Sequence, residues 1–200
     1  MEISQQFIEA IENGDIQTVQ SLIDTMLLAS DPDTQYEIAN MLVQAGYLNE
    51  AEQVLEHLQF LFPEEAQLKI DRAQVLMDID QEDDALLLLT SIEEHTDEYP
   101  QALLSLADYY QMQGFYETAE QKINQALALL PTEPVLIFAK AELLLETGKY
   151  IEAVRLYENL KEQTEEIAGI LYQNGWLKCI AQVPLMRRQF LIMMNLYLIM

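Results

Sequence analysis

The 200-residue chain is half apolar and carries 34 acidic against 10 basic residues, so its formal net charge at pH 7 is −24. This charge repels phosphate and anionic lipid, which excludes nucleic acids and acidic membrane surfaces as natural partners. A single cysteine, Cys179, excludes an internal disulfide, and residues 1–14 lack the basic and apolar regions of a secretory signal. We therefore expect a cytoplasmic protein.

Residues 1–31 are predicted to form a pair of helices. Apolar residues recur at helical spacing over 4–12 and again over 15–28, and Gly14 marks the turn between the two segments. The outward positions of this pair are polar, as they must be at the solvent-facing end of a stack of helices. We interpret residues 1–31 as an N-terminal cap, or as a degenerate copy of the helix pairs that follow.

The clearest of the following helix pairs lies at residues 100–133. Apolar residues share one face of a helix over 101–113, and Gly114 breaks this pattern. A second helix over 115–130 follows, and Pro131 closes it. The same arrangement is predicted at residues 32–65, 66–99 and 134–167. At the end of the 32–65 pair, we expect Phe60 and Phe62 to pack beneath the next turn.

Two series of alanines keep a period of 34 residues through these four pairs. The first helices carry Ala39, Ala73, Ala107 and Ala141, and the second helices carry Ala51, Ala85, Ala119 and Ala153. A small residue is needed where two antiparallel helices cross closely, because a larger side chain would push the axes apart. The turns between the helices fall at Gly46, Gly114 and Gly148, with Asp80 in place of glycine in the second pair.

With these residues and the prolines Pro63, Pro100 and Pro131, the chain resembles the tetratricopeptide repeat family. The resemblance covers residues 32–167 as four repeats. It implies an all-α fold, an α-solenoid of antiparallel helix pairs that stack as a right-handed superhelix. It also implies a scaffold or adaptor that binds a protein or peptide, similar to the cytosolic multi-repeat proteins of Gram-positive bacteria.

In this family the first helices line a concave groove, and positions two, five, nine, twelve and thirteen of each repeat contact the partner. Carried over, these contacts come from Tyr36, Asn40, Val43 and Gln44 in the first repeat and from Gln67, Ile70, Gln74 and Met77 in the second. The third repeat supplies Gln101, Leu104, Asp108 and Gln111, and the fourth supplies Val135, Phe138, Glu142 and Leu145. For any single residue, ordinary helix packing or a solvated surface is an equally good interpretation.

The groove residues indicate the charge of the partner. Family members that grip acidic chaperone tails use lysine and asparagine at positions five and nine, and here only Asn40 fits. Asp108 and Glu142 beside Ile70 and Phe138 suit instead a basic, apolar-studded helix or strand. The alternative is a peptide-sensing regulatory protein, although such regulators usually add a basic helix-turn-helix or an effector bundle, which this sequence lacks.

Catalytic, cofactor and metal motifs are absent from the sequence. The acids that begin at Asp78 fail as a calcium loop, because Asp83 and Leu89 stand where glycine and glutamate are needed. His57 and His95 are isolated from other ligands at metal spacing. We therefore predict that the protein is not an enzyme and binds no cofactor or metal.

The segment 168–200 departs from the rest of the chain. From Gln173 onward it contains no acidic residue, and Arg187 stands where the repeat requires a small residue. The codons possible for this tail, read in a neighbouring frame, allow a further repeat. We hypothesise that residues 173–200 are an out-of-frame reading of a fifth repeat in a longer protein. Otherwise this apolar tail is predicted to fold back as a cap or to mediate self-association.

Overall fold

The computed structural model describes residues 3–163, and this part of the chain consists of ten α-helices with no strand. The predicted all-α fold is confirmed. The proposed frameshift and the self-association of the tail concern residues outside those described. The chain divides into two compact units, Met1–Ser105 and Leu106–Met200. The boundary falls inside one helix, α7 (Tyr99–Met112).

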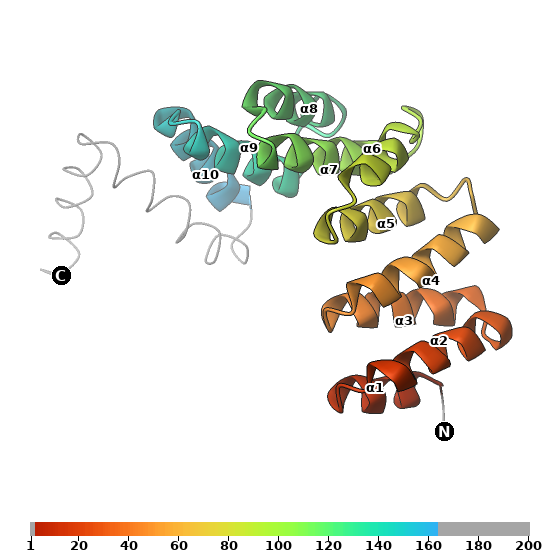
Figure 1. Cartoon of the computed structure of the whole chain (residues 1–200). Helices are drawn as coiled ribbons and strands as arrows, with labels where there is room; N and C mark the ends of the chain where they lie inside the picture. Colours follow the sequence, from red (N-terminus) through yellow and green to blue (C-terminus); the bar gives the residue numbers. More distant parts are fainter. Residues whose placement is uncertain (1–2, 164–200) are drawn as a thin grey trace, which may run out of the picture. The chain divides into compact units, whose positions relative to one another are not determined.

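The first unit is a stack of antiparallel helix pairs (Figure 1). Its complete helices are α1 (Ile3–Glu12), α2 (Ile16–Ala29), α3 (Pro32–Gln44), α4 (Leu48–Leu61), α5 (Ala66–Asp78) and α6 (Glu82–Thr90). Aspartates cap two of them: the backbone N–H of Thr18 donates to Asp15 Oδ1 over 3.1 Å, and that of Thr34 donates to Asp31 Oδ1 over 3.0 Å. These bonds satisfy N–H groups that a helix start otherwise leaves without a partner.

The second unit contains the end of α7 followed by α8 (Tyr116–Leu129), α9 (Pro134–Glu146) and α10 (Tyr150–Gln163). Helix α9 packs against both α8 and α10. In the core of this unit, Leu143 of α9 clusters with buried residues of α7 and α8. Ile137 and Leu144 of α9 cluster with buried residues of α10.

Both alanine series lie entirely in the core, as predicted from their spacing. Each of the eight residues is 0% exposed: Ala39, Ala51, Ala73, Ala85, Ala107, Ala119, Ala141 and Ala153. Val19 of α2, which follows Gly14 as Ala51 follows Gly46, is also 0% exposed. Large apolar residues such as Leu42 and Val54 fill the space beside these close contacts. The burial of both series agrees with the close helix crossings that their spacing predicts.

The turns between paired helices all use a left-handed backbone. Gly14, Gly46, Gly114 and Gly148 have positive φ values, and Asp80, with φ of 61°, adopts the same conformation. Aspartate tolerates this region better than most residues with a Cβ atom. The prediction that Asp80 replaces the turn glycine is confirmed.

The expected packing of Phe60 and Phe62 is wrong, because the two side chains are 82% and 43% exposed. The buried face of α4 runs through Val54, Leu55 and Leu58. Phe60 lies two positions beyond Leu58, which turns it away from that face. The end of α4 therefore presents apolar surface to solvent.

Candidate protein-binding surface

The residues implied as partner contacts lie on the first helices of the pairs, and the structure places most of them at the surface. The exposed members are Asn40, Gln44, Gln74, Gln101, Asp108 and Val135. The half-buried members are Tyr36, Val43, Gln67, Met77, Leu104, Gln111, Phe138, Glu142 and Leu145. Of the full implied set of sixteen residues, which also includes Ile70, ten belong to the first unit and the remaining six to the second.

Ile70 is a correction to the implied set, because its side chain is 0% exposed. It lies four residues after Ala66 and three before Ala73, and both alanines are buried in the core. Residues at this spacing share one helix face. Ile70 therefore stabilises the helix stack and has no surface to offer a partner in this structure.

In the first unit, a carboxylate joins α3 to α5. The hydroxyl of Tyr36 donates to Asp71 Oδ2 over 2.6 Å, and Gln67 Nε2 donates to Asp71 Oδ1 over 2.7 Å. Burial and the hydrogen bond to Asp71 raise the pKa of the Tyr36 phenol. Two of the implied contact residues are therefore held in place by an acid that the resemblance did not indicate.

A pocket of about 320 Å³ lies beside this hydrogen-bonded group. Helices α3, α4 and α5 and the segments that precede α5 contribute its lining: Pro32, Asp33, Tyr36, Leu58, Phe62, Glu65, Gln67 and Leu68. Apolar side chains form most of its wall, two carboxylates belong to its lining, and none of the lining residues is basic. Sequence spacing does not predict this pocket, because Leu58 comes from the second helix α4 and Phe62 from the segment that follows it.

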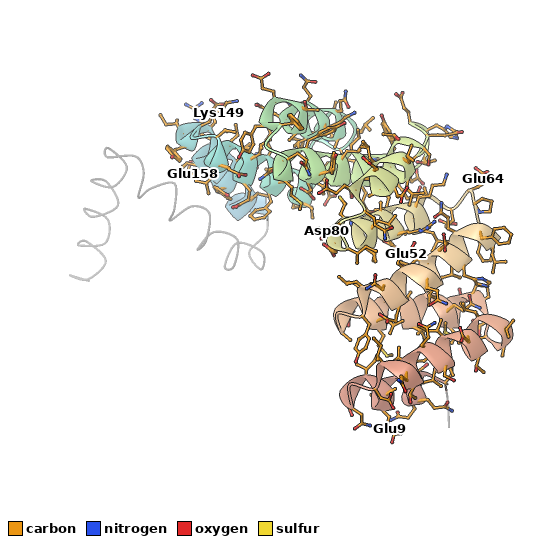
Figure 2. The ribbon with its side chains drawn as sticks, in the orientation of Figure 1. Glu9, Glu52, Glu64, Asp80, Lys149 and Glu158 are labelled. Atoms are coloured by element: carbon orange, nitrogen blue, oxygen red, sulfur yellow. The ribbon has the colours of Figure 1, made fainter. Side chains whose placement is uncertain are left out.

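At the neighbouring contact between α4 and α5, one arginine of α5 binds two acids and an amide of α4. Arg72 Nη2 lies 2.7 Å from Glu52 Oε1 and 2.8 Å from Glu56 Oε1, and Arg72 Nη1 donates to Gln59 over 2.8 Å. Glu52 is labelled on α4 in Figure 2. Glu52 and Glu56 therefore share one cation within the fold, whereas neither acid of the pocket belongs to an ion pair among the described residues.

In the second unit, acids on α9 accept hydrogen bonds from other helices. Gln111 Nε2 donates to Glu146 Oε2 over 2.5 Å, and the Tyr116 hydroxyl donates to Glu146 Oε1 over 3.2 Å. Glu142 accepts a hydrogen bond from Tyr157, whose side chain is 2% exposed. Glu142, predicted as a partner contact, therefore has a structural role in fixing α10 on α9.

Asp108 of α7 is a partly desolvated acid. The residue is exposed, yet desolvation by the surrounding protein raises the pKa of its carboxyl group. Its negative charge is thus less well solvated than that of a free side chain. A cation placed beside Asp108 would restore part of that lost stabilisation.

The described residues contain no group of three or more side chains able to hold a metal ion. Within the same part of the chain, no helix combines the length and apolarity that crossing a membrane would require.

Comparison with known proteins agrees with this architecture. The profile of the YpiA-like tetratricopeptide-repeat family matches residues 111–165. The TPR repeat-containing protein YpiA of Bacillus subtilis (strain 168) is 34% identical over 166 residues, which is 83% of this chain. The chain is a tetratricopeptide-repeat protein. It spans 39% of the length of YpiA, so the activity of the whole relative does not transfer to it directly.

Solved structures show the same tetratricopeptide-repeat fold. The crystal structure of TTC0263, a thermophilic TPR protein in Thermus thermophilus, has a TM-score of 0.66 at 21% identity, covering 88% of this chain and all of that one. The crystal structure of MamA protein has a TM-score of 0.51 at 14% identity, covering 76% of this chain and 91% of that one. At 21% and 14% identity, both likenesses show the fold alone.

Proposed function

We propose that this tetratricopeptide-repeat protein is a scaffold or adaptor that binds a protein segment on the first helices of its repeats. The observation that carries the proposal is the accessible face of α3 and α5. Asn40, Gln44 and Gln74 are exposed there, and half-buried Val43 and Met77 lie at neighbouring implied contact positions. A surface that mixes accessible polar groups with apolar side chains is typical of a protein interface.

Charge supports a basic partner. The chain has a formal net charge of −24, and its acids are distributed over the helices of both units (Figure 2). In the second unit, the exposed Asp108 is partly desolvated and Glu146 is exposed on α9. Such a field speeds the encounter with a basic segment and disfavours an acidic one. The expected partner segment is basic and carries apolar residues that contact the first helices.

Affinity capture with the full chain tests this function. Wild type, Asp108→Lys and Glu158→Lys are used as bait in a cell lysate, and captured proteins are identified by mass spectrometry. Glu158 is exposed on the second helix α10, so its charge reversal is a matched control away from the first helices (Figure 2). We expect basic proteins to be lost from the Asp108→Lys bait and kept by the Glu158→Lys bait. Equal capture by all three baits would contradict the proposal.

A further inference from the structure

We propose that the pocket between α3, α4 and α5 binds an arginine side chain of the partner segment. This inference rests on the proposed function, because it names the residue type that one part of the surface recognises. The pocket lies within the first unit and shares Tyr36 and Gln67 with the implied contact residues.

The size and walls of the pocket suit one long side chain. Its volume of about 320 Å³ is at the lower end of the range of about 300 to 1,000 Å³ that is common for small-molecule sites. Leu58 and Leu68 are buried at its wall, and Phe62 is 43% exposed. The methylene groups of an arginine would pack against this apolar wall while its guanidinium group stays near polar atoms.

The carboxylates of the pocket supply the complementary charge. Glu65 is the residue at the start of α5, but its side chain makes no capping hydrogen bond there. Asp33 lies in the first turn of α3. Neither acid belongs to an ion pair among the described residues. A guanidinium group can donate to two carboxylates at once, which favours arginine over lysine.

The charge of Glu65 reaches the ring of Tyr36, since Glu65 is among the groups that raise the pKa of that phenol. The aromatic rings of Tyr36 and Phe62 therefore lie in the same pocket as the acids. A guanidinium group can stack on such rings while it pairs with carboxylates. The acids, the apolar wall and the aromatic rings of the pocket therefore all favour the same ligand, an arginine side chain.

The arginine that the chain itself has nearby is already engaged. Arg72 of α5 binds Glu52, Glu56 and Gln59 of α4, and it is absent from the pocket lining. The exposed apolar residues Phe60 and Leu61 stand next to the pocket residue Phe62 in the chain. We therefore expect an apolar residue beside the arginine in the partner segment.

The test is a titration of the full-length, ¹⁵N-labelled protein with N-acetyl-arginine amide, followed by NMR. N-acetyl-citrulline amide is the neutral probe of the same shape. N-acetyl-lysine amide carries a charge without a planar guanidinium group, so it tests whether that group is needed. We expect the arginine probe to shift the amide signals of Tyr36, Phe62 and Leu68. The citrulline probe should bind at least about fivefold more weakly, the change expected when an ion pair worth about 1 kcal/mol is removed. The lysine probe should fall between the two.

A pair of variants with equal charge change locates the effect. Asp33→Asn/Glu65→Gln should weaken the arginine probe by about fivefold or more. Glu12→Gln/Asp24→Asn removes two exposed acids outside the pocket lining and should leave binding unchanged. Circular dichroism verifies that both variants fold, and the comparison of probes on wild type needs no variant.

Three results would overturn the inference: no binding of the arginine probe, equal binding of arginine and citrulline, or equal weakening by both variants. These results differ from a failure of the proposed function. A lysate capture that depends on Asp108 while the pocket ignores arginine would remove only the pocket assignment. Arginine binding in the pocket with capture that is insensitive to Asp108→Lys would instead contradict the proposed function.

Discussion

The hydroxyl of Tyr36 lies 2.6 Å from Oδ2 of Asp71, a residue 35 positions further along the chain. In the second unit, Gln111 and Glu146 are also 35 positions apart and also hydrogen-bonded. Because this separation is one residue more than the repeat period, each of the two hydrogen bonds joins the first helices of adjacent pairs. Polar bonds between neighbouring pairs therefore add to the apolar contacts that the alanines allow within each pair.

Replacing Tyr36 with phenylalanine should lower the free energy of unfolding by about 1 kcal/mol, because Asp71 loses one of its two hydrogen bonds. Urea unfolding followed by circular dichroism measures this change. Tyr150→Phe removes a hydroxyl for which the structure shows no hydrogen bond among the described residues, and it should be close to neutral. Similar losses for both variants would contradict the assigned role of the Tyr36 hydroxyl.

The difference in unfolding free energy between wild type and Tyr36→Phe should depend on pH. The folded protein raises the pKa of Tyr36, chiefly through burial and then through Asp71, so folding favours the protonated phenol. This contribution is fully present below the unfolded value of 10.0 and is lost as the pH rises through the raised pKa. The advantage of wild type over Tyr36→Phe should therefore shrink in alkaline solution. An advantage that grows above pH 10.0 would give the wrong sign.

Enlarging a buried alanine should destabilise the helix pair that contains it. Ala119 in α8 is 0% exposed, and leucine at this position should lower the free energy of unfolding by about 1 to 3 kcal/mol through overpacking. Ala128 lies in the same helix and is exposed, so Ala128→Leu is the matched control. Thermal and urea unfolding should show little change for the control. Two equal changes would mean that α8 does not cross its neighbours as closely as the structure shows.

The left-handed turns predict opposite effects at two equivalent positions. Gly46 has φ of 81°, and a Cβ added to it would meet no atom within 4 Å, so Gly46→Ala should destabilise through backbone strain alone, by about 1 kcal/mol. Asp80→Gly should relieve strain and stabilise by about 0.5 kcal/mol. Urea unfolding of the two variants checks both signs. Destabilisation by Asp80→Gly would indicate that the aspartate side chain compensates for its backbone.

Acid should weaken the cap of α3. The backbone and hydroxyl hydrogen bonds from Thr34 lower the pKa of Asp31, so its charged form stabilises the folded protein. This stabilisation is present above the unfolded value of 3.8 and is lost as the pH falls through the lowered pKa. Asp31→Asn still caps but does not titrate. Unfolding of the two proteins across this range should show a wild-type advantage near neutral pH that disappears in strong acid.

Features that depend on local backbone and steric limits were predictable from the sequence. The alanine series and the turn at Asp80 each follow from a restriction at a single position, repeated at a fixed period. Side-chain partners were harder to predict. Glu142 occupies an expected contact position, yet it accepts a hydrogen bond from Tyr157, which lies on the other helix of its pair. The family pattern assigns a role to a position and cannot show which neighbouring side chain will engage it.

The same limit explains the missed acid and the missed pocket. Asp71 is at the sixth position of its repeat, for which the resemblance implied no partner contact, and its link to Tyr36 needs the stacking of α3 on α5. The pocket requires Leu58 from a second helix and Phe62 from the segment after it, beside residues of two first helices. Sequence spacing identified the residues of each helix face. The structure was needed to show which faces meet.

The boundary between the two units has a practical consequence for anyone who wants to express them as separate fragments. It lies between Ser105 and Leu106, within the fourteen residues of α7. Cutting there would leave each fragment with about half of a helix, too short to be stable by itself and with unpaired backbone groups at the new end. Fragments that both retain the whole of α7, and therefore overlap in sequence, are the better design for isolating either unit.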